Sequence, residues 1–252
     1  MFLCKIYMME IVAIIPSRYG STRFPGKPLI DIKGKTMINR VYEQTKIAVD
    51  KVFVATDDRR IFDHVVSFGG AAIMTSTSHK SGTDRCAEAA EKISNQTNSS
   101  IDVVINIQGD EPFIKPAQIK ELCDEFNEES IQLATLAKQF KKNEEIFDPN
   151  KPKVILNKYN EAIYFSRSPI PYMQNVPDDK WIEHHDFFKH VGLYGYRYNT
   201  LQEITRLPGG ILEKAESLEQ NRWIENGYKI KVALTNEENI AVDTPKDLEK
   251  IV

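Results

Sequence analysis

The chain has 252 residues, of which 41% are hydrophobic and 27% are charged, an ordinary balance for a globular protein with a sizeable core. Its formal net charge of −3 argues against a nucleic-acid-binding protein, which is usually basic. Because no apolar run of the sequence approaches the ~20 residues of a membrane span, we expect neither a membrane nor a nucleic acid as partner.

The cysteines and the start of the chain point to a reducing compartment. Cys4, Cys86 and Cys123 lack CxxC spacing and so indicate neither a disulfide framework nor a thiolate zinc site. The opening segment is apolar but short and has no small-residue cleavage site, which argues against a signal peptide. Met8 or Met9 is an alternative start, because the first predicted strand follows directly.

Short apolar runs alternate with helical patterns through the first half of the chain. Strands are predicted at 11–15, 52–55, 71–74 and 103–107, and helices at 37–48, 59–68 and 83–93. Such alternation implies βαβ units, right-handed crossovers and a mostly parallel sheet. The polar stretch 95–100 is expected to be a surface loop.

The second half is less regular. It predicts a helix from 116 to about 128, a helix at 213–226, and strands at 132–138, 154–156, 162–165, 190–198 and 230–233. The turn at 157–160 would join two of these strands in a hairpin. Residues 169–186, rich in Pro, Asp and aromatic side chains, would form an excursion. We expect one α/β domain over 1–252 with a smaller inserted lobe at about 152–198.

The first strand runs into a loop that carries three cations, Arg18, Arg23 and Lys27, together with Gly20 and Gly26. A buried strand that delivers backbone amides and positive charge to its C-terminal end is suited to phosphates. The loop is not a Walker A motif, because five residues separate its glycines and proline follows the lysine. A loop of merely solvated cations is the alternative, but the position and the absence of interspersed acids favour a nucleotide site.

Carboxylates follow three apolar runs. Asp110 lies just beyond the run 103–107, Asp57 and Asp58 follow the second predicted strand, and Asp243 follows a late apolar run. Triphosphate chemistry uses Mg²⁺, which takes one or two carboxylates together with phosphate oxygens and water. Asp110 and Asp243 are therefore candidate ligands, whereas helix capping is the alternative for Asp243 and for the Asp57–Asp58 pair.

Eight sequence blocks spread over nearly the whole chain form a recognisable series. They lie at 15–29, 55–58, 79–85, 106–112, 164–171, 190–196, 212–220 and 242–245. In content and order they resemble the blocks of the sugar-acid cytidylyltransferases, most of all the branch that acts on 3-deoxy-manno-octulosonate (Kdo). The Phe-Pro-Gly-Lys-Pro-Leu stretch that ends the first block favours this branch over the sialate branch, which generally has Pro-x-Lys-Asn there.

The resemblance implies a Rossmann-like nucleotidyltransferase that works as a homodimer in the cytoplasm of a bacterium that makes lipopolysaccharide. The implied reaction is CTP + Kdo → CMP-Kdo + diphosphate, with Mg²⁺. Catalysis would depend on Lys27, Arg18 and Asp110. Contacts with CTP would come from Pro16, Ser17, Arg18, Gly20, Ser21, Arg23, Lys27, Thr56, Asp57, Ser81, Gly82, Arg85 and Gln108. The sugar acid would be held by Gln108, Arg167, His190, Tyr194 and Glu213, and the metal by Asp110 and Asp243.

Simpler roles stay open for several of these residues. Arg167 is a fitting bidentate partner for a sugar carboxylate, but a surface ion pair is the alternative. His190, at a strand end, could simply be hydrogen-bonded within the structure. Glu213, Glu216 and Glu219 recur at i, i+3 spacing, and a solvated helix face is the expectation for the last two.

Three other functions compete with the implied reaction. The acceptor could be N-acetylneuraminate or an amino-substituted Kdo rather than Kdo. The chain could also be a non-catalytic nucleotide-binding regulator, although Lys27, Asp110 and Asp243 together count against that. Nucleic-acid binding through the basic loop is a third idea, and the acidic total charge opposes it.

Overall fold

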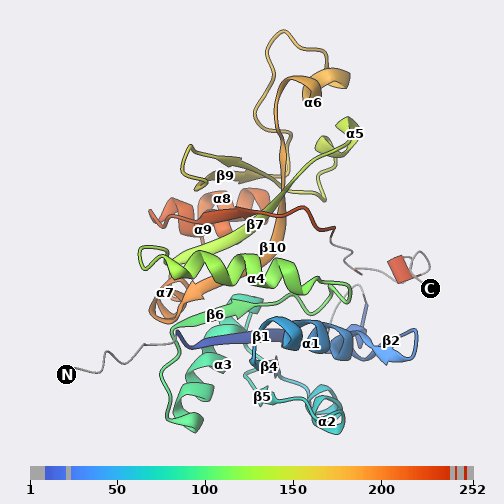
Figure 1. The fold of residues 1–252 in the computed structure, drawn as a ribbon, viewed down its shortest axis with the longest axis vertical. Helices are drawn as coiled ribbons and strands as arrows, with labels where there is room; N and C mark the ends of the chain where they lie inside the picture. The colour runs from blue at the N-terminus through green and yellow to red at the C-terminus, as the bar shows by residue number, and fades with distance from the viewer. Residues whose placement is uncertain (1–8, 21–23, 239–241, 243–246, 249–252) are drawn as a thin grey trace, which may run out of the picture.

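The structure, a computed structural model, describes residues 9–20, 24–238, 242 and 247–248. It is built around a nine-stranded sheet (Figure 1). Seven strands follow one another in the order β11-β7-β10-β6-β1-β4-β5, and β8 and β9 extend the sheet beside β10. Their bounds are β1 Ile11–Ser17, β4 Lys51–Thr56, β5 Ala72–Met74, β6 Val103–Asn106, β7 Leu133–Gln139, β8 Lys153–Leu156, β9 Ala162–Ser166, β10 Phe188–Arg197 and β11 Lys231–Leu234.

Helices occupy the connections between these strands. They are α1 Met37–Ala48, α2 Arg59–Ser67, α3 Gly82–Thr97, α4 Pro116–Asp124, α5 Asn143–Ile146, α6 Trp181–His184, α7 Tyr198–Ile204, α8 Ile211–Glu216 and α9 Gln220–Glu225. Short 3₁₀ turns lie at η1 Lys27–Leu29, η2 Glu125–Asn127 and η3 Asp178–Lys180, and β2 Asp31–Ile32 pairs with β3 Lys35–Thr36. None of the helices among the described residues is long and apolar enough to cross a membrane.

The sheet is mostly parallel, as the sequence predicts. β1 is parallel to β4 and β6, β4 is parallel to β5, and β11 is parallel to β7. β10 is the exception on the main path, because it runs antiparallel to both of its neighbours, β6 and β7. The predicted α/β, Rossmann-like class is therefore confirmed.

Two apolar cores cover the two faces of the sheet. Alternate residues of β1 point to opposite faces, so Val12 and Ile14 join the core under α3, whereas Ala13 and Ile15 join the core under α1, α2 and α4. A strand that is buried on both faces reads as a continuous apolar run, and this explains the Ile-Val-Ala-Ile-Ile sequence of β1. Because β1 and β6 are parallel, their C-terminal ends lie at the same edge of the sheet (Figure 1).

Local signals account for the good agreement in the first half. The bounds of α1 are the predicted ones, with the Thr36 side chain accepting a hydrogen bond from the backbone of Asn39 at the N-cap. The expected loop at 95–100 is wrong in its first part, because α3 continues to Thr97 and ends at Asn98 in a left-handed conformation (φ 50°). The Thr97 hydroxyl donates to the Ile93 carbonyl at 2.8 Å and so satisfies the last turn.

The predicted long helix at 213–226 is also wrong. The structure has two short helices there, α8 and α9, and Ser217 between them is left-handed (φ 51°). The break turns the side chain of Leu218 into the core beneath α3. The first turn of α8 is stabilised by a residue far along the chain, since the Glu225 carboxylate accepts hydrogen bonds from the backbone of Ile211 and Leu212 at 3.1 Å each.

The range expected to form a smaller lobe, 152–198, contains three elements. The first is the predicted hairpin, now β8 and β9. The second is the excursion, where α6 lies away from the central sheet (Figure 1) and a small apolar cluster forms around Trp181, Phe187 and Phe140. The third is β10, which pairs with β6 and β7 in the main sheet. The division of the chain into a main domain and a lobe stays a prediction.

Candidate active site

A cavity of about 240 Å³ opens where β1 and β6 end. Its walls come from the loop after β1, the η1 turn, the segment before α3 and the loop after β6. The lining residues are Pro16, Ser17, Arg18, Lys27, Pro28, His79, Lys80, Ser81, Gly82, Arg85, Gln108, Gly109 and Asp110. Crevices at the carboxyl ends of parallel strands are where α/β proteins bind ligands, and most of the residues predicted to touch a nucleotide lie here.

The predicted cation and the predicted carboxylate meet in this cavity. The Nζ atom of Lys27 lies 2.8 Å from Oδ2 of Asp110. Lys27 is presented by η1, which starts after Gly26 in the left-handed region (φ 71°), whereas Asp110 follows β6. The sequence predicts the cations in a phosphate loop and the carboxylates as candidate metal ligands, and the structure pairs one member of each set directly.

Val242 lies beside this pair. The backbone N–H of Val242 donates to the carbonyl of Asp110 at 2.9 Å, and the Val242 side chain is buried against Ile32 and Met37. Asp243, the second predicted metal ligand, lies outside the described residues, as do Ser21 and Arg23 of the phosphate loop.

The donor set fits a magnesium ion that is bound mainly through its nucleotide. Among the described residues there is no group of three or more His, Cys, Asp or Glu that could form a protein cage for a metal. Mg²⁺ commonly takes one or two carboxylates and completes its shell with phosphate oxygens and water. Asp110 places a carboxylate at the cavity wall, and its second oxygen is left over from the Lys27 contact.

The start of α3 forms another wall. Ser81 caps the helix, accepting from the backbone of Asp84 at 3.1 Å, while the Asp84 carboxylate accepts from the backbone of Ser81 at 3.2 Å. Gly82 follows the cap, and a Cβ there would lie 3.2 Å from the Pro16 ring. The free amides and positive end of a helix N-terminus favour an anionic ligand.

Gly109 allows the loop after β6 to pass close to β1. A Cβ at this position would lie 3.0 Å from both the carbonyl oxygen of Pro16 and the Oγ of Ser17. The Ser17 hydroxyl is buried and has no hydrogen-bond partner among the described residues. An unpaired hydroxyl at a cavity wall is suited to a ligand, because burial without a partner costs about 1–3 kcal/mol.

Arg85 lines the cavity and is held there by a buried hydrogen-bond network. It is 4% exposed, and its guanidinium donates to the Asp57 carboxylate at 2.8 Å and to the Thr75 hydroxyl at 2.5 Å. Thr56 is buried, and its hydroxyl accepts from the backbone of Asp58 at 3.2 Å. Thr56 and Asp57 are absent from the described cavity lining, so they support the wall through Arg85 and the β4 end.

Two other positions that the sequence singles out, Asp58 and Gly20, also lie outside the described cavity lining. Asp58 caps α2, accepting from the backbone of Arg60 at 2.9 Å, so the capping alternative holds for Asp58 and not for Asp57. Gly20 lies next to Tyr19, whose ring faces the Arg60 guanidinium at 3.3 Å from the ring centroid. A Cβ at Gly20 would meet no described atom within 4 Å, and Gly20 lies outside the described cavity lining.

Gln108 connects the cavity to β10. Its side-chain amide donates to the Gly192 carbonyl at 2.9 Å, and β10 carries both His190 and Tyr194. Tyr194 is buried, packing edge-on against Trp223 and stacking on Tyr196. Burial raises the pKa of the Tyr194 phenol well above its usual value, so this side chain is neutral.

His190 is a neutral histidine that is hydrogen-bonded within the structure. Its Nε2 lies 3.0 Å from the Thr135 hydroxyl, which itself donates to the Leu193 carbonyl at 2.7 Å. Because that hydroxyl has one proton, the histidine is the donor in their contact. Burial lowers the pKa of His190 to about 3. The contact with Thr135 agrees with the alternative in which His190 is a hydrogen-bonded structural residue rather than a ligand of the sugar acid.

Arg167 binds backbone carbonyls rather than a carboxylate. Its Nε donates to Glu216 at 2.7 Å, its Nη1 to Pro149 at 2.9 Å and its Nη2 to Ser217 at 3.4 Å. Glu213 caps the start of α8, accepting from the backbone of Gly210 at 3.0 Å, and lies 3.3 Å from the Arg222 guanidinium. Neither residue is part of the described cavity lining, and their roles toward a sugar acid stay predictions.

The solvated face expected for Glu216 and Glu219 is wrong. The Glu216 carboxylate accepts from the Ser166 hydroxyl at 2.6 Å and from the Arg167 backbone at 2.9 Å. The Glu219 carboxylate accepts from the Thr83 hydroxyl at 2.6 Å. Burial raises the pKa of Glu219, against the lowering effect of Thr83. The break between α8 and α9 turns these acids inward, which i, i+3 spacing on a continuous helix does not foresee.

His79 and Lys80 line the cavity, although the sequence assigns no role to either. Both belong to the block at 79–85, so that block contained the signal. Nothing in the spacing distinguished them from the adjacent Ser81 and Gly82.

A phosphate-suited cavity at the edge of a mostly parallel sheet defines a nucleotide-using α/β enzyme. Residues 12–231 match the family model described as cytidylyltransferase, and the chain belongs to this family. It is 56% identical over 247 residues to a 3-deoxy-manno-octulosonate cytidylyltransferase of Parabacteroides distasonis, covering 96% of this chain and 97% of that protein. A protein of the same name from Bacteroides thetaiotaomicron is 52% identical over 244 residues, covering 96% of each chain.

Solved structures agree with this assignment. A CMP:2-keto-3-deoxy-manno-octonic acid synthetase complexed with CTP superposes with a TM-score of 0.87 at 43% identity and 96% coverage of both chains. A cytidylyltransferase from Leptospira borgpetersenii, 17% identical, superposes with a TM-score of 0.61 over 97% of this chain and 85% of its own. At that identity the second likeness concerns the fold alone.

Proposed function

We propose that this chain transfers CMP from CTP to Kdo, forming CMP-Kdo and diphosphate, and so activates Kdo for lipopolysaccharide synthesis. The observation that carries the proposal is the Lys27–Asp110 pair in the cavity at the ends of β1 and β6. The relatives named for this reaction support it, since they match the chain over nearly its full length.

The reaction requires little covalent chemistry from the protein. The anomeric hydroxyl oxygen of Kdo bonds to the α-phosphorus of CTP while the bond from that phosphorus to the bridging oxygen of diphosphate breaks, and the hydroxyl proton passes to solvent. Positioning and charge neutralisation then supply most of the rate. Lys27 is a compact cation suited to the α-phosphate, and Arg18, exposed at the cavity mouth, suits the outer phosphates.

Magnesium completes the charge balance in this proposal. Asp110 and Asp243 would hold the ion, which would neutralise the phosphate oxygens of the bound nucleotide. Lys27 orients Asp110 through the contact at 2.8 Å. The amides at the start of α3 add partial positive charge on the opposite wall.

The acceptor is proposed to bind beside β10. Gln108 supports this, because its hydrogen bond to Gly192 joins the cavity wall to the strand that carries His190 and Tyr194. Arg167 uses three of the five N–H donors of a guanidinium on carbonyls, which leaves two for the sugar carboxylate. Glu213 is proposed on the same side of the acceptor.

An acceptor assay tests the function. The purified chain is incubated with CTP, Mg²⁺ and one of Kdo, 8-amino-Kdo or N-acetylneuraminate, and diphosphate release is measured. Kdo is expected to give the highest kcat/KM. Preference for N-acetylneuraminate would overturn the choice of acceptor, and CTP binding without diphosphate release on any acceptor would indicate a nucleotide-binding regulator instead.

The working state is proposed to be a homodimer in the cytoplasm. The family resemblance supports both points. Light scattering after size-exclusion chromatography measures the mass in solution, and a monomer mass near the 28.9 kDa of the chain at assay concentrations would contradict the dimer.

A further inference from the structure

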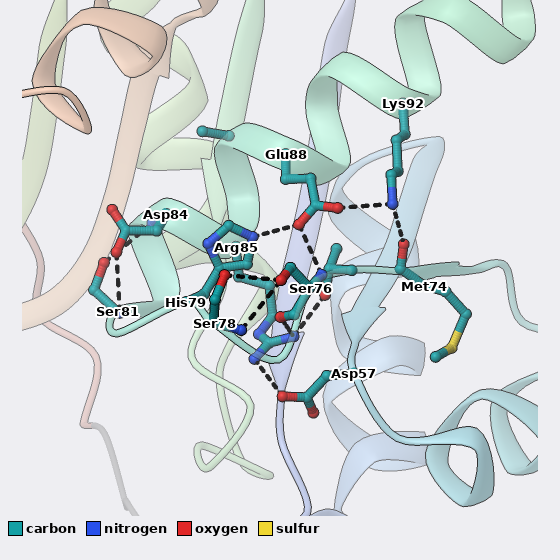
Figure 2. Close-up of polar contacts among 12 residues, drawn as sticks. Asp57, Met74, Ser76, Ser78, His79, Ser81, Asp84, Arg85, Glu88 and Lys92 are labelled. Atoms are coloured by element: carbon teal, nitrogen blue, oxygen red, sulfur yellow. Dashed lines mark hydrogen bonds and ion pairs between the residues drawn. The ribbon is translucent and has the colours of Figure 1, made fainter.

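The segment between β5 and α3, residues 75–81, forms one wall of the cavity through His79, Lys80 and Ser81. It contains no helix or strand. Its backbone is bonded to the sheet at its first residue, where the N–H of Thr75 donates to the Thr56 carbonyl at 2.8 Å, so the rest of its shape depends on side chains. A connection of this kind keeps one conformation when side chains of a rigid element hold it. Figure 2 shows that α3 provides those side chains.

Three side chains of α3 reach back to this segment. Arg85, Glu88 and Lys92 stand at i, i+3 and i+7, which places them on one face of the helix. Arg85 donates to the Ser76 carbonyl at 3.4 Å, and Lys92 donates to the Met74 carbonyl at 2.8 Å. The Arg85 contact holds the segment near its beginning, and the Lys92 contact holds Met74, the last residue of β5, just before it.

Glu88 makes the central contacts. One carboxylate oxygen accepts from the backbone N–H of Ser76 at 2.8 Å and pairs with Nε2 of His79. The other oxygen lies 2.7 Å from the Lys92 ammonium. Glu88 therefore ties two points of the segment, three residues apart, to the rigid helix (Figure 2).

The carboxylate is charged when it does this. Burial raises the pKa of Glu88, but hydrogen bonds from Lys92, the Ser76 backbone and His79 together lower it to about 2. Hydrogen bonds to an ionised acceptor are about twice as strong as neutral ones. The segment is thus held by charge-assisted contacts, and the second residue that they hold, His79, is part of the cavity wall.

We propose that Glu88 is a positioning residue for the nucleotide: it fixes His79 and the 76–79 turn in the shape that lines the CTP site, without touching CTP itself. This inference rests on the proposed function, since it takes CTP as the occupant of the cavity. It predicts an effect on CTP that is separate from any effect on the sugar acid, because all of the residues proposed to hold the acceptor, apart from Gln108, lie outside the described cavity lining.

The test compares two substitutions on the same helix. Glu88→Gln keeps the size of the side chain and removes its charge. Glu91→Gln is the matched control, because Glu91 is exposed on α3 and makes no hydrogen bond or ion pair that the described part of the chain shows. Binding of CTP is measured by titration calorimetry without acceptor, and KM is measured separately for CTP and for Kdo.

We expect Glu88→Gln to weaken CTP binding about tenfold, the size of one lost charge-assisted hydrogen bond, with the KM for Kdo within twofold of wild type. Glu91→Gln should leave both unchanged. Lys92→Met removes the lysine contact of Glu88 and leaves its Ser76 and His79 contacts, so it should weaken CTP binding less than Glu88→Gln does. If Glu88→Gln fails to fold, a weaker binding of CTP by Lys92→Met supports the inference, and unchanged binding contradicts it.

Three outcomes would count against the inference. Unchanged CTP binding in a folded Glu88→Gln variant would remove Glu88 from the site, and an equal rise in both KM values would indicate a general structural role. If wild type binds CTP but the acceptor assay fails, the proposed function falls while the Glu88 comparison still stands. If wild type does not bind CTP, both proposals are overturned.

Discussion

Charged side chains serve different purposes at the cavity and at the α8–α9 side of the molecule. At the cavity, Lys27 and Asp110 bind each other, and both line space that a ligand can enter. At α8 and α9, Arg167 and Glu216 bind backbone groups and thereby hold chain segments together. The first arrangement can exchange its internal contacts for a substrate, whereas the second one loses structure if its contacts are broken.

The largest expected effect tests the cavity side. Lys27→Ala and Asp110→Asn should each lower kcat by about two to three orders of magnitude, because each removes a charge at the reacting phosphates. Neither should change the thermal midpoint greatly, because both residues line the cavity rather than the apolar core. Steady-state diphosphate release and thermal melting measure the two effects.

A surface lysine provides the control for this pair. Lys35→Ala breaks an exposed contact with Glu43 and should leave kcat unchanged. Near-normal kcat in Lys27→Ala or Asp110→Asn would exclude that residue from the mechanism. If the two residues act as a unit, the double variant should lose less than the product of the single losses.

The next effect tests the α8–α9 side. Arg167→Ala should lower the free energy of unfolding by about 1–3 kcal/mol, because three carbonyl oxygens lose a charged donor. Urea denaturation measures this loss. Arg206→Ala, at an exposed position just after α7, is the control and should be neutral. A stable Arg167→Ala variant whose KM for Kdo alone has risen would show that the residue serves the acceptor rather than the fold.

His190 sharpens the same comparison through pH. Since burial lowers its pKa to about 3 from 6.5, the ring stays neutral in the folded chain while the unfolded chain takes up a proton below pH 6.5. The stability that His190 contributes is present above pH 6.5 and is lost as the pH falls toward 3. The ring resonances should not titrate between pH 5 and about pH 9, the range that NMR would cover. A midpoint near 6.5 would contradict the buried, neutral state.

The smallest effect concerns Glu88. Its pKa of about 2 lies below the ordinary value of 4.5, so its stabilising contribution is present above pH 4.5 and is lost as the pH falls toward 2. The difference in urea midpoint between wild type and Glu88→Gln should therefore narrow between pH 6 and about pH 3. A constant difference would argue that His79, Ser76 and Lys92 do not bind the ionised carboxylate. Glu91→Gln should show no such narrowing.

The sequence predicts the fold best where local signals decide it. The strand β1 and the helix α1 follow from an unbroken apolar run and from a cap at Thr36. The break at Ser217 is not predicted, because Glu225, fourteen residues beyond Ile211, stabilises the start of α8 and periodicity does not register such a contact. The helix α7 is missed for a similar reason, since the alternating pattern of β10 runs on to its first residue, Tyr198.

In the candidate site, too, the sequence predicts what local signals decide and misses contacts between distant segments. Strand ends place Lys27 and Asp110 near one another, so the sequence could predict a phosphate site at that edge. Their direct contact depends on the path of the η1 turn, which no pattern specifies. The support of His79 by Glu88 joins a loop to a helix face, and the motif block contains only one of the two residues.

The hydrogen bond from Val242 to Asp110 also bears on how the protein can be handled. A residue near the C-terminal end of the chain contacts a proposed metal ligand at the reaction centre and is packed beside β2 and α1. A change to the chain at Val242 therefore acts next to the proposed metal ligand, whereas a change just ahead of β1 acts at the opposite end of that strand from the cavity. Val242 is therefore a position at which a spectroscopic reporter would sense the state of the catalytic centre.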